Sequence, residues 1–464
     1  MAATAGFQEM QDWQACCYGE SGLKDNQMRK RIIFLCWLCV LLPAAMQAQR
    51  NTVSPEEANT DSLKADHKVS YFGTGERPDS LQERRLIDLF YYDQFRHFND
   101  PRAPYFLFMS RDADLAMGIG GVVRMRGWID WGGVVNTGGF IPYMISVPAD
   151  AVNRRKIGST PSGTALYFRV LGRNVAVGDY QLYIEANFNG YQARDFSLKK
   201  AYATINDWTL GYTNSTFSDP LAASPLVDGQ GSPAEVRTTS VLLRWMHTWN
   251  SKWGAAASVE MPSSHIGANG ETNKALNDWI PDIAAFVQYE WGYNEHIRLS
   301  AILRTLSYRD LVKSSNVTVP GWGLQLSSVF RPCRPMTIYA TVNAGKGYGS
   351  LSNDLLMGNF DLVDSPYRSG RMYTPWAVGW TGAVQCYLHQ KVFVSCTVGQ
   401  MRYMPAGTVD SNTYKYGLYV AANIFWNLTP RIQAAAEFNW GRRENFSGEG
   451  NNARRVSLVA QFAF

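Results

Sequence analysis

The chain has 464 residues, of which 46% are apolar and 18% are charged, and its net charge at pH 7 is +5. No apolar run reaches the roughly 18 residues that a membrane-spanning helix needs, which argues against a helical membrane protein. The mild charge, 44 Lys and Arg against 39 Asp and Glu, argues against a dedicated nucleic-acid binder. Aromatic residues at 13% and 40 glycines instead favour strands and turns.

The N-terminal region has the pattern of a secretory signal peptide. Basic residues at 29–31 precede a short apolar run over 32–46. The sequence Ala44-Ala45-Met46-Gln47-Ala48 then suits cleavage after Ala48, although Met46 is larger than the cleavage pattern prefers. We therefore predict a signal peptide over residues 1–48, with Met28 as an alternative start of translation. A single membrane anchor is the less favoured interpretation, because the run is too short.

Residues 49–114 are predicted to form a partly disordered extension. The stretch 49–74 is polar and shows no apolar period, as expected of a flexible leader. Ser80 and Glu83 then form a capping-box pattern, and the apolar stripe that follows predicts a helix over about 81–98. Whether that helix covers an opening or associates with copies of itself stays open.

From residue 115 onward, stretches of about ten residues alternate apolar and polar side chains. The last stretch shows the pattern clearly, because its polar face carries Arg455, Ser457 and Gln461. Its apolar face carries Val456, Leu458, Ala460, Phe462 and Phe464. This is the period of a strand with one face toward lipid and the other toward water.

Such stretches follow one another over 115–131, 164–173, 177–189, 196–205, 207–216, 238–249, 252–261, 281–292, 295–308, 320–331, 335–346, 374–388, 391–403, 412–427, 431–443 and 452–464. Short connections alternate strictly with long ones, such as 134–163 and 347–372. We therefore predict an all-β fold, a transmembrane antiparallel β-barrel of about 16 strands over residues 115–464. An even number of strands leaves both ends of the barrel on the same side.

A soluble β-sandwich is the alternative interpretation of alternating strands. Its strands are usually about five or six residues long, whereas a tilted strand needs about ten to cross a bilayer. Tryptophans also lie near the ends of the predicted strands, among them Trp128, Trp249 and Trp426. Because indole rings favour the headgroup boundary, this placement favours the membrane barrel.

The polar faces of a barrel of this size would line an aqueous lumen. Arginine recurs on them, at Arg124, Arg126, Arg169, Arg244, Arg298, Arg304, Arg431 and Arg455. Acidic residues there are fewer, so a surplus of guanidinium groups would favour small anions over cations. In the alternative interpretation these arginines pair with loop carboxylates and brace the wall.

The connection 217–237 is long enough to fold inward and narrow the pore. Asp219, Asp228 and Glu235 would then face the arginines and create a field across the constriction. An exposed outer loop is the alternative.

A family resemblance becomes visible around this connection. The residues that carry it are Lys200-Ala201-Tyr202, Trp208-Thr209-Leu210-Gly211, Ser215-Thr216-Phe217-Ser218-Asp219-Pro220 and Val227-Asp228-Gly229-Gln230-Gly231. This stretch resembles the DcaP-like porins. The resemblance implies a homotrimer of sixteen-stranded barrels in the Gram-negative outer membrane, an inward-folded third loop, a periplasmic helical extension and passage of small dicarboxylates. A general or phosphate-type porin is the alternative.

No pattern in the chain indicates an enzyme or a metal site. The 6 histidines are scattered without metal-ligand spacing, and neither a nucleophile elbow nor a phosphate loop occurs. His247 could serve a barrel phospholipase, but no serine is placed to partner it. We expect no catalysis, cofactor, metal or nucleic-acid partner; outer-membrane lipid, copies of the chain and small anions are the expected partners. A structural or adhesin barrel is a further alternative.

Overall fold

The computed structural model describes residues 68–74, 76, 80–81, 83, 87, 98, 106–112, 114–135, 137–174, 178–189, 195–250, 252–292, 294–407 and 409–464. All of them belong to the second of the two units of the chain, Val53–Phe464. The predicted signal peptide over 1–48 lies outside the described residues. Within the described residues, no helix is long and apolar enough to cross a membrane.

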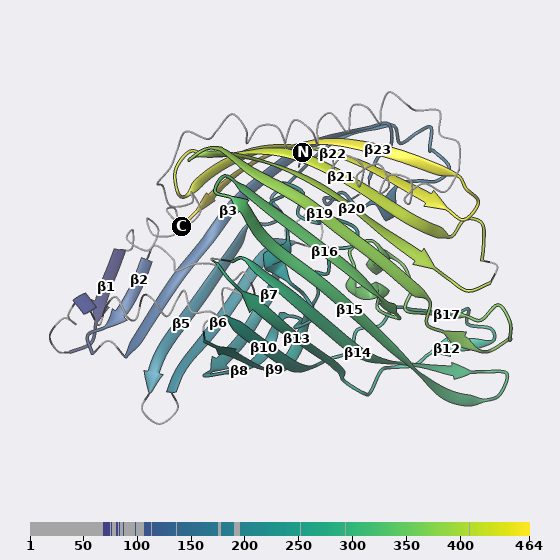
Figure 1. Cartoon of the computed structure of the whole chain (residues 1–464), viewed down its shortest axis with the longest axis horizontal. Helices are drawn as coiled ribbons and strands as arrows, with labels where there is room; N and C mark the ends of the chain where they lie inside the picture. The colour runs from purple at the N-terminus through teal and green to yellow at the C-terminus, as the bar shows by residue number, and fades with distance from the viewer. Residues whose placement is uncertain are drawn as a thin grey trace, which may run out of the picture. The chain divides into compact units, whose positions relative to one another are not determined.

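The chain folds into a closed antiparallel β-barrel (Figure 1). Its first eight strands are β3 (Leu115–Trp131), β5 (Ala165–Asn174), β6 (Gly178–Asn189), β7 (Asp195–Ile205), β8 (Trp208–Asn214), β9 (Thr239–Trp249), β10 (Trp253–Glu260) and β13 (Asp282–Glu290). The next eight are β14 (His296–Asp310), β15 (Ser315–Cys333), β16 (Met336–Lys346), β19 (Trp376–His389), β20 (Val392–Met404), β21 (Tyr414–Asn427), β22 (Ile432–Asn445) and β23 (Gly450–Ala463). Each pairs with the next, and β23 pairs with β3 to close the ring. The predicted sixteen-stranded barrel is confirmed.

Side chains alternate between the two faces of the barrel wall, as the sequence predicts. In β14, the apolar side chains of Ile297, Leu299 and Leu303 are exposed. Arg298 and Ser300, which lie between them, are fully buried. The exposed apolar face is therefore the outside of the barrel, and the polar face is the inside, as in barrels whose outer surface meets lipid.

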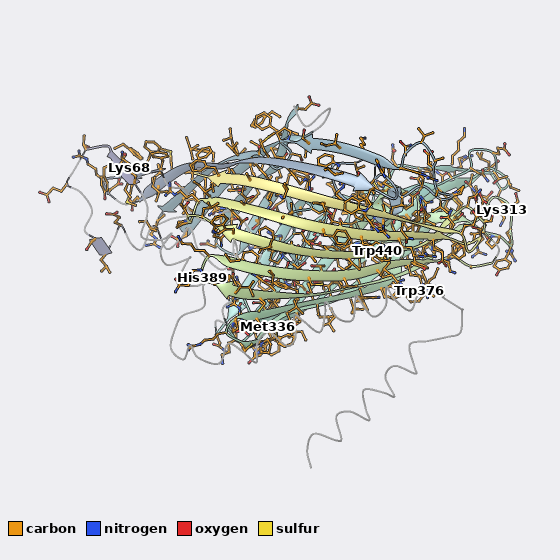
Figure 2. All side chains as sticks on the ribbon, turned by 90° about the horizontal axis from the view of Figure 1, so that it is seen from above. Lys68, Lys313, Met336, Trp376, His389 and Trp440 are labelled. Carbon is orange, nitrogen blue, oxygen red and sulfur yellow. The ribbon has the colours of Figure 1, made fainter. Side chains whose placement is uncertain are left out.

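The two ends of the barrel differ in their connections. In Figure 2, Met336 and His389 mark the end with short turns, and Lys313 and Trp376 mark the other end. The prediction of strictly alternating short and long connections is wrong, because β14 and β15 stay paired as far as Asp310 and Ser315. The paired residues 309–310 and 315–316, which lie between the predicted stretches 295–308 and 320–331, show no apolar alternation. Pairing of the backbone can continue beyond the lipid, where neither face of a strand has to be apolar.

Short elements occupy the connections at the long-loop end. They are β4 (Arg155–Thr160), which pairs with β3, β12 (Asn273–Ala275), which pairs with β14, and a small sheet of β11 (Ile266–Gly267), β17 (Leu362–Asp364) and β18 (Met372–Tyr373). In the described part of the chain, 3-10 turns accompany them at η2 (Pro142–Met144), η4 (Pro220–Ala222), η5 (Gly349–Leu351) and η6 (Leu355–Met357). The strand β4 lies within a predicted loop.

Trp128 lies inside the barrel, so its assignment to the outer aromatic belt is wrong. The guanidinium carbon of Arg455 lies 5.0 Å from the centre of its ring. Gly158 of β4 faces the same ring, and a Cβ at Gly158 would overlap with it. The inner partners of this tryptophan could not be foreseen from its place near a strand end.

Two strands before residue 115 join the barrel sheet. β2 (Phe106–Ser110) pairs antiparallel with β3, and β1 (Lys68–Phe72) pairs parallel with β2. Leu107 and Met109 of β2 pack in a buried apolar cluster with Leu171. The prediction of a flexible leader over 49–74 is therefore wrong for β1, because a five-residue strand is too short to show a period and gains its stability from pairing.

Only part of the predicted helix over 81–98 can be compared with the structure. Leu81, Glu83 and Ile87 are helical, and Phe98 lies in a turn. The hydroxyl of Tyr71 in β1 donates to the Glu83 carboxylate at 2.6 Å. The remaining residues of that helix lie outside the described residues.

Candidate functional site

Loop 215–238, which contains the predicted constriction loop, connects opposite walls of the barrel. Its Asp219 contacts β14, and its Asp228 contacts β3. β3 and β14 are eight strand pairings apart in either direction around the ring. Because all of its wall partners are inward-facing side chains, the loop crosses the inside of the barrel.

The first anchor of this loop is a buried charge cluster at Asp219. Its carboxylate lies 2.9 Å from Nε2 of His296 and 3.3 Å from Nη1 of Arg298. The hydroxyl of Ser327 on β15 also donates to it. Burial alone would raise the pKa of Asp219, but the charges of Arg298 and His296 and the hydrogen bonds hold it well below the usual range.

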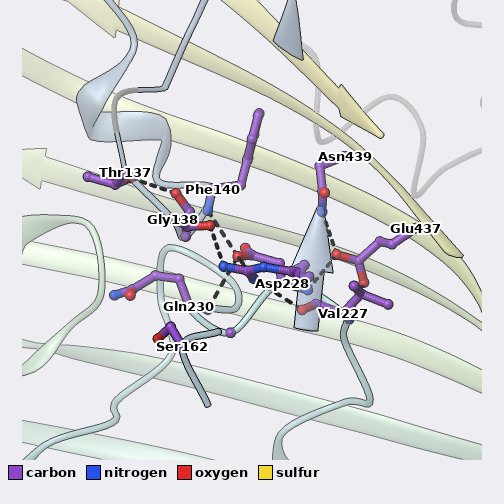
Figure 3. Close-up of polar contacts among 12 residues, drawn as sticks. Thr137, Gly138, Phe140, Ser162, Val227, Asp228, Gln230, Glu437 and Asn439 are labelled. Atoms are coloured by element: carbon purple, nitrogen blue, oxygen red, sulfur yellow. Dashed lines mark hydrogen bonds and ion pairs between the residues drawn. The ribbon is translucent and has the colours of Figure 1, made fainter. Parts of the chain in front are cut away.

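The second anchor is at Val227 and Asp228 (Figure 3). Their backbone amides donate to the Glu437 carboxylate of β22 at 2.7 and 2.8 Å. Arg124 and Arg126 of β3 donate to the carbonyl oxygen of Val227 at 2.8 and 3.2 Å. Arg126 also lies 3.6 Å from the Asp228 carboxylate. Most of these contacts are made to the backbone of the loop, so this anchor depends less on the loop's own side chains than the first anchor does.

Glu235 does not face the arginines of the wall, contrary to the sequence hypothesis. Its carboxylate accepts a hydrogen bond from Arg237 of the same loop at 2.6 Å. Because Arg237 is only two residues away, the charge of Glu235 is paired within the loop itself. Of the three predicted constriction residues, only Asp219 and Asp228 contact the inner wall.

A second inward loop, 132–154, rests on Arg455. This guanidinium makes a two-point ion pair with Asp130, at 2.6 and 2.9 Å. It also donates to carbonyl oxygens of the loop, including that of Gly138 at 3.1 Å. The amide of Phe140 donates to the Asp228 carboxylate at 2.9 Å, so this loop is joined to loop 215–238.

A third inward loop, 347–375, rests on Arg304. Its guanidinium lies 3.0 Å from the Asp282 carboxylate and 3.3 Å from that of Asp361. It also donates to the carbonyl oxygen of Gly347 at 3.0 Å. Asn353 of this loop donates to two carbonyl oxygens of loop 215–238. The three loops therefore form one connected structure inside the barrel.

Asp354 lies where loop 347–375 meets β21. Its carboxylate accepts a hydrogen bond from the Tyr414 hydroxyl at 2.8 Å, and its side chain is fully buried. Burial raises its pKa to about 7, and the hydrogen bond from Tyr414 and the charge of Arg443 offset that rise only in part. This aspartate therefore favours its neutral form.

Apolar side chains also gather inside the barrel. The loops contribute Phe217, Ala234, Val236, Tyr348, Leu351 and Leu355, and the inner wall contributes residues such as Ile302 and Met401. The sequence predicts polar faces around an aqueous lumen, whereas at this level loops and wall form a packed apolar cluster. The sequence analysis did not predict that loops 132–154 and 347–375 fold inward. The apolar residues in the connection 347–372 were a signal that could have indicated it.

The other predicted arginines have different surroundings. Arg169 is fully buried, with its guanidinium carbon 5.1 Å from the ring of Tyr183, which packs between Tyr167 and Tyr202. Arg244 is 4% exposed and donates to the carbonyl oxygen of Asn214 at 3.1 Å. Arg431 lies in the short turn before β22 rather than on a strand.

The ion pairs bear on the two interpretations of the arginines. Arg126, Arg298, Arg304 and Arg455 each lie between 2.6 and 3.6 Å from a carboxylate oxygen. The geometry of these four favours the interpretation in which arginine braces the wall and its loops. Arg124 is half-buried and, among the described residues, has no carboxylate oxygen within ion-pair distance.

His247 lies on the outer face and has an acidic partner that sequence reasoning missed. Its Nδ1 lies 2.7 Å from the Asp207 carboxylate, and its ring stacks on Trp245. No serine hydroxyl in the described part of the chain is hydrogen-bonded to it. Among those residues, no group of three or more His, Cys, Asp or Glu side chains could hold a metal ion.

Comparison with known proteins identifies the fold. The outer membrane channel DcaP of Acinetobacter baumannii is similar with a TM-score of 0.65 and 18% identity, over 78% of this chain and 100% of that one. Two further matches are weaker: a loop-deletion form of the outer membrane protein OmpT of Vibrio cholerae (TM-score 0.48, 9% identity, 76% and 100% covered) and OprB of Pseudomonas putida (0.45, 7%, 75% and 94%). No family model and no curated protein matches the chain. The chain has a DcaP-like porin fold.

Proposed function

We propose that the chain is an outer-membrane channel through which small hydrophilic solutes diffuse. The observation that carries this proposal is the closed barrel of sixteen strands, with apolar side chains exposed outside and charged side chains turned inside. A barrel of this size normally encloses a passage. The fold similarity to a solved outer membrane channel supports the same conclusion.

The proposed channel sits with its long loops toward the outside of the cell and its short turns in the periplasm. The N-terminal extension, with β1 and β2, would then be periplasmic, and residues 1–48 would direct secretion. We also propose a homotrimer, as the family resemblance implies. The mass of the detergent-solubilised complex tests this point, and a monomer would contradict it.

The proposed solutes are small anions such as dicarboxylates. Arg124 is half-buried, and its guanidinium donates to the carbonyl oxygen of Val227 at the second anchor of loop 215–238. It supports this preference, because no carboxylate of the described residues lies within ion-pair distance of it. A guanidinium at a constriction lowers the energy of a passing anion and raises that of a cation.

A channel without charge preference is the second candidate. The ion pairs of Arg126, Arg298, Arg304 and Arg455 favour it, because a paired guanidinium contributes little net field to the passage. The two candidates predict different reversal potentials.

Single-channel recording in planar bilayers under a salt gradient tests both candidates. Conductance steps are expected for the purified protein, and their absence would overturn the channel proposal. An anion-directed reversal potential supports the first candidate, and a reversal potential near zero supports the second. A cation-directed potential contradicts both.

The substitution Arg124→Gln sharpens the test of anion preference. We expect it to move the reversal potential toward that of a cation-selective channel, because it removes one inner charge. Arg173→Gln is the matched control, since Arg173 is exposed and pairs with Asp179 across a short turn of the barrel. If the reversal potential of Arg124→Gln equals that of the unchanged protein, this guanidinium braces the loop and does not select anions. Replacing Arg298 is less informative, because it also removes the Asp219 anchor.

We propose no catalytic activity for the chain. The half-buried pair of His247 and Asp207 motivates one check, phospholipid hydrolysis by the same preparation. Hydrolysis that His247→Ala abolishes would establish a lipase instead.

A further inference from the structure

Phe98 is 1% exposed although it belongs to none of the barrel strands. It packs with Met246, Ala256 and Phe286, which lie side by side on β9, β10 and β13. Leu243 and Val287 on the same strands are exposed on the outside, and they stand at positions of the opposite parity. The ring of Phe98 therefore lies inside the barrel.

Charged and aromatic side chains hold this ring in place. The guanidinium carbon of Arg244 lies 3.5 Å from its centre, and that of Arg298 lies 6.0 Å away. The ring of Phe286 is tilted against it with 6.3 Å between centres. A cation over the face of an aromatic ring is attracted by the electrons of the ring, most strongly where water is excluded.

The backbone of Phe98 is fixed as well. Its carbonyl oxygen accepts a hydrogen bond from the side-chain amide of Asn214 at 3.1 Å. Asn214 ends β8 and directly precedes loop 215–238. Ring and backbone are therefore both bound to the same side of the barrel interior.

Phe98 and loop 215–238 share their arginines. Arg298 lies near the Phe98 ring and also pairs with Asp219 and donates to the carbonyl oxygen of Ser218 at 3.1 Å. Arg244 lies over the ring and donates to the carbonyl oxygen of Asn214. The residue and the loop therefore obstruct neighbouring parts of the lumen.

We propose that Phe98 is a lumen-blocking residue that sets, together with loop 215–238, the size of solute the channel admits. Its ring fills the interior beside β9, β10 and β13, next to the place where Asp219 of the loop is anchored on β14. Small solutes pass the remaining width, and bulkier ones are excluded. This inference rests on the proposed channel function.

The test is the substitution Phe98→Ala in the full chain, with single-channel recording in planar bilayers. We expect a higher conductance and a larger exclusion limit for polyethylene glycols of graded size. Phe106→Ala is the matched control, because Phe106 belongs to the same N-terminal segment but is 45% exposed on the outside of β2. Its conductance is expected to equal that of the unchanged protein.

A second variant keeps the test decisive if Phe98→Ala does not fold. Phe98→Trp enlarges the ring, so we expect a lower conductance and a smaller exclusion limit; circular dichroism checks the barrel of each variant. Conductance equal to the unchanged protein in either folded variant overturns the role of Phe98 and leaves the channel intact. Absence of steps in all the proteins, Phe106→Ala included, overturns the proposed function itself.

Discussion

Two aspartates on inward loops are equally buried but have opposite surroundings. Asp219 on loop 215–238 lies against Arg298, His296 and Ser327, and its pKa is held below the usual range. Asp354 on loop 347–375 has one hydroxyl donor, that of Tyr414, and its pKa is raised to about 7. Burial acts on both alike, so the presence of a buried cation decides whether the loop is held by a charge or by a neutral acid.

The largest expected effect is that of Asp219→Ala. It leaves Arg298 and His296 buried without their carboxylate, and breaking a buried ion pair in this way costs about 3 to 5 kcal/mol of unfolding free energy. Guanidinium unfolding in detergent at pH 6 measures the loss. Asp179→Ala, in the exposed pair with Arg173, is the control and should cost about 1 kcal/mol or less.

The effect of Asp219→Ala should disappear in acid. A carboxyl group whose pKa is lowered by folding stabilises the protein above its unfolded pKa of about 3.9. That contribution is lost as the pH falls through the lower folded pKa. If the free energies of unfolding of Asp219→Ala and the unchanged protein differ as much at pH 2 as at pH 6, Asp219 does not anchor the loop by its charge.

Asp354→Asn should show the opposite pH dependence. The raised pKa means that the Asp354 carboxyl contributes fully below about pH 4, and that its contribution is lost as the pH rises through about 7. The side-chain amide of the variant does not titrate. As the pH rises from about 4 to about 7, the free energy of unfolding of the variant should therefore increase by roughly 2 to 4 kcal/mol relative to that of the unchanged protein. Unfolding midpoints at pH 4, 6 and 8 measure the gain, and parallel pH profiles would exclude a neutral Asp354.

The smallest expected effect is that of Tyr414→Phe. Removing the hydroxyl deprives the Asp354 carboxylate of its donor, which should cost about 0.5 to 1.5 kcal/mol. It should also move the pH dependence of stability to higher pH, because the hydrogen bond lowers the pKa of Asp354. Tyr367→Phe is the control, since Tyr367 is 75% exposed. Equal pH profiles in the two variants would mean that Tyr414 does not act on Asp354.

The strands could be predicted because their signal is local. The stretch predicted over 295–308 is observed as β14 (His296–Asp310), and its alternation needs no knowledge of distant residues. β1 could not be found in this way, because it owes its existence to pairing with β2. Trp128 was misplaced for the same reason, since its partner Arg455 lies at the other end of the barrel sequence.

The candidate site could be predicted only as a set of residue types. Arg298 and Asp219 were both candidates, but nothing in the sequence indicates that His296 and Ser327 complete their cluster. The sequence likewise shows an apolar loop at 347–372 without showing that it turns inward. Phe98 was one residue of a predicted helix, and its contact with Arg244 depends on the closure of the barrel.

The sequence by itself determined the barrel, its strand number and which alternating strand positions face in or out. The physical reason is that a strand between two different solvents repeats every two residues, and that repeat is written in adjacent positions. Only the tertiary structure decided which inner charges meet. Arg455 and Asp130 are separated by 325 positions, and the closing of the ring and the folding of the loops brought them within 2.6 Å.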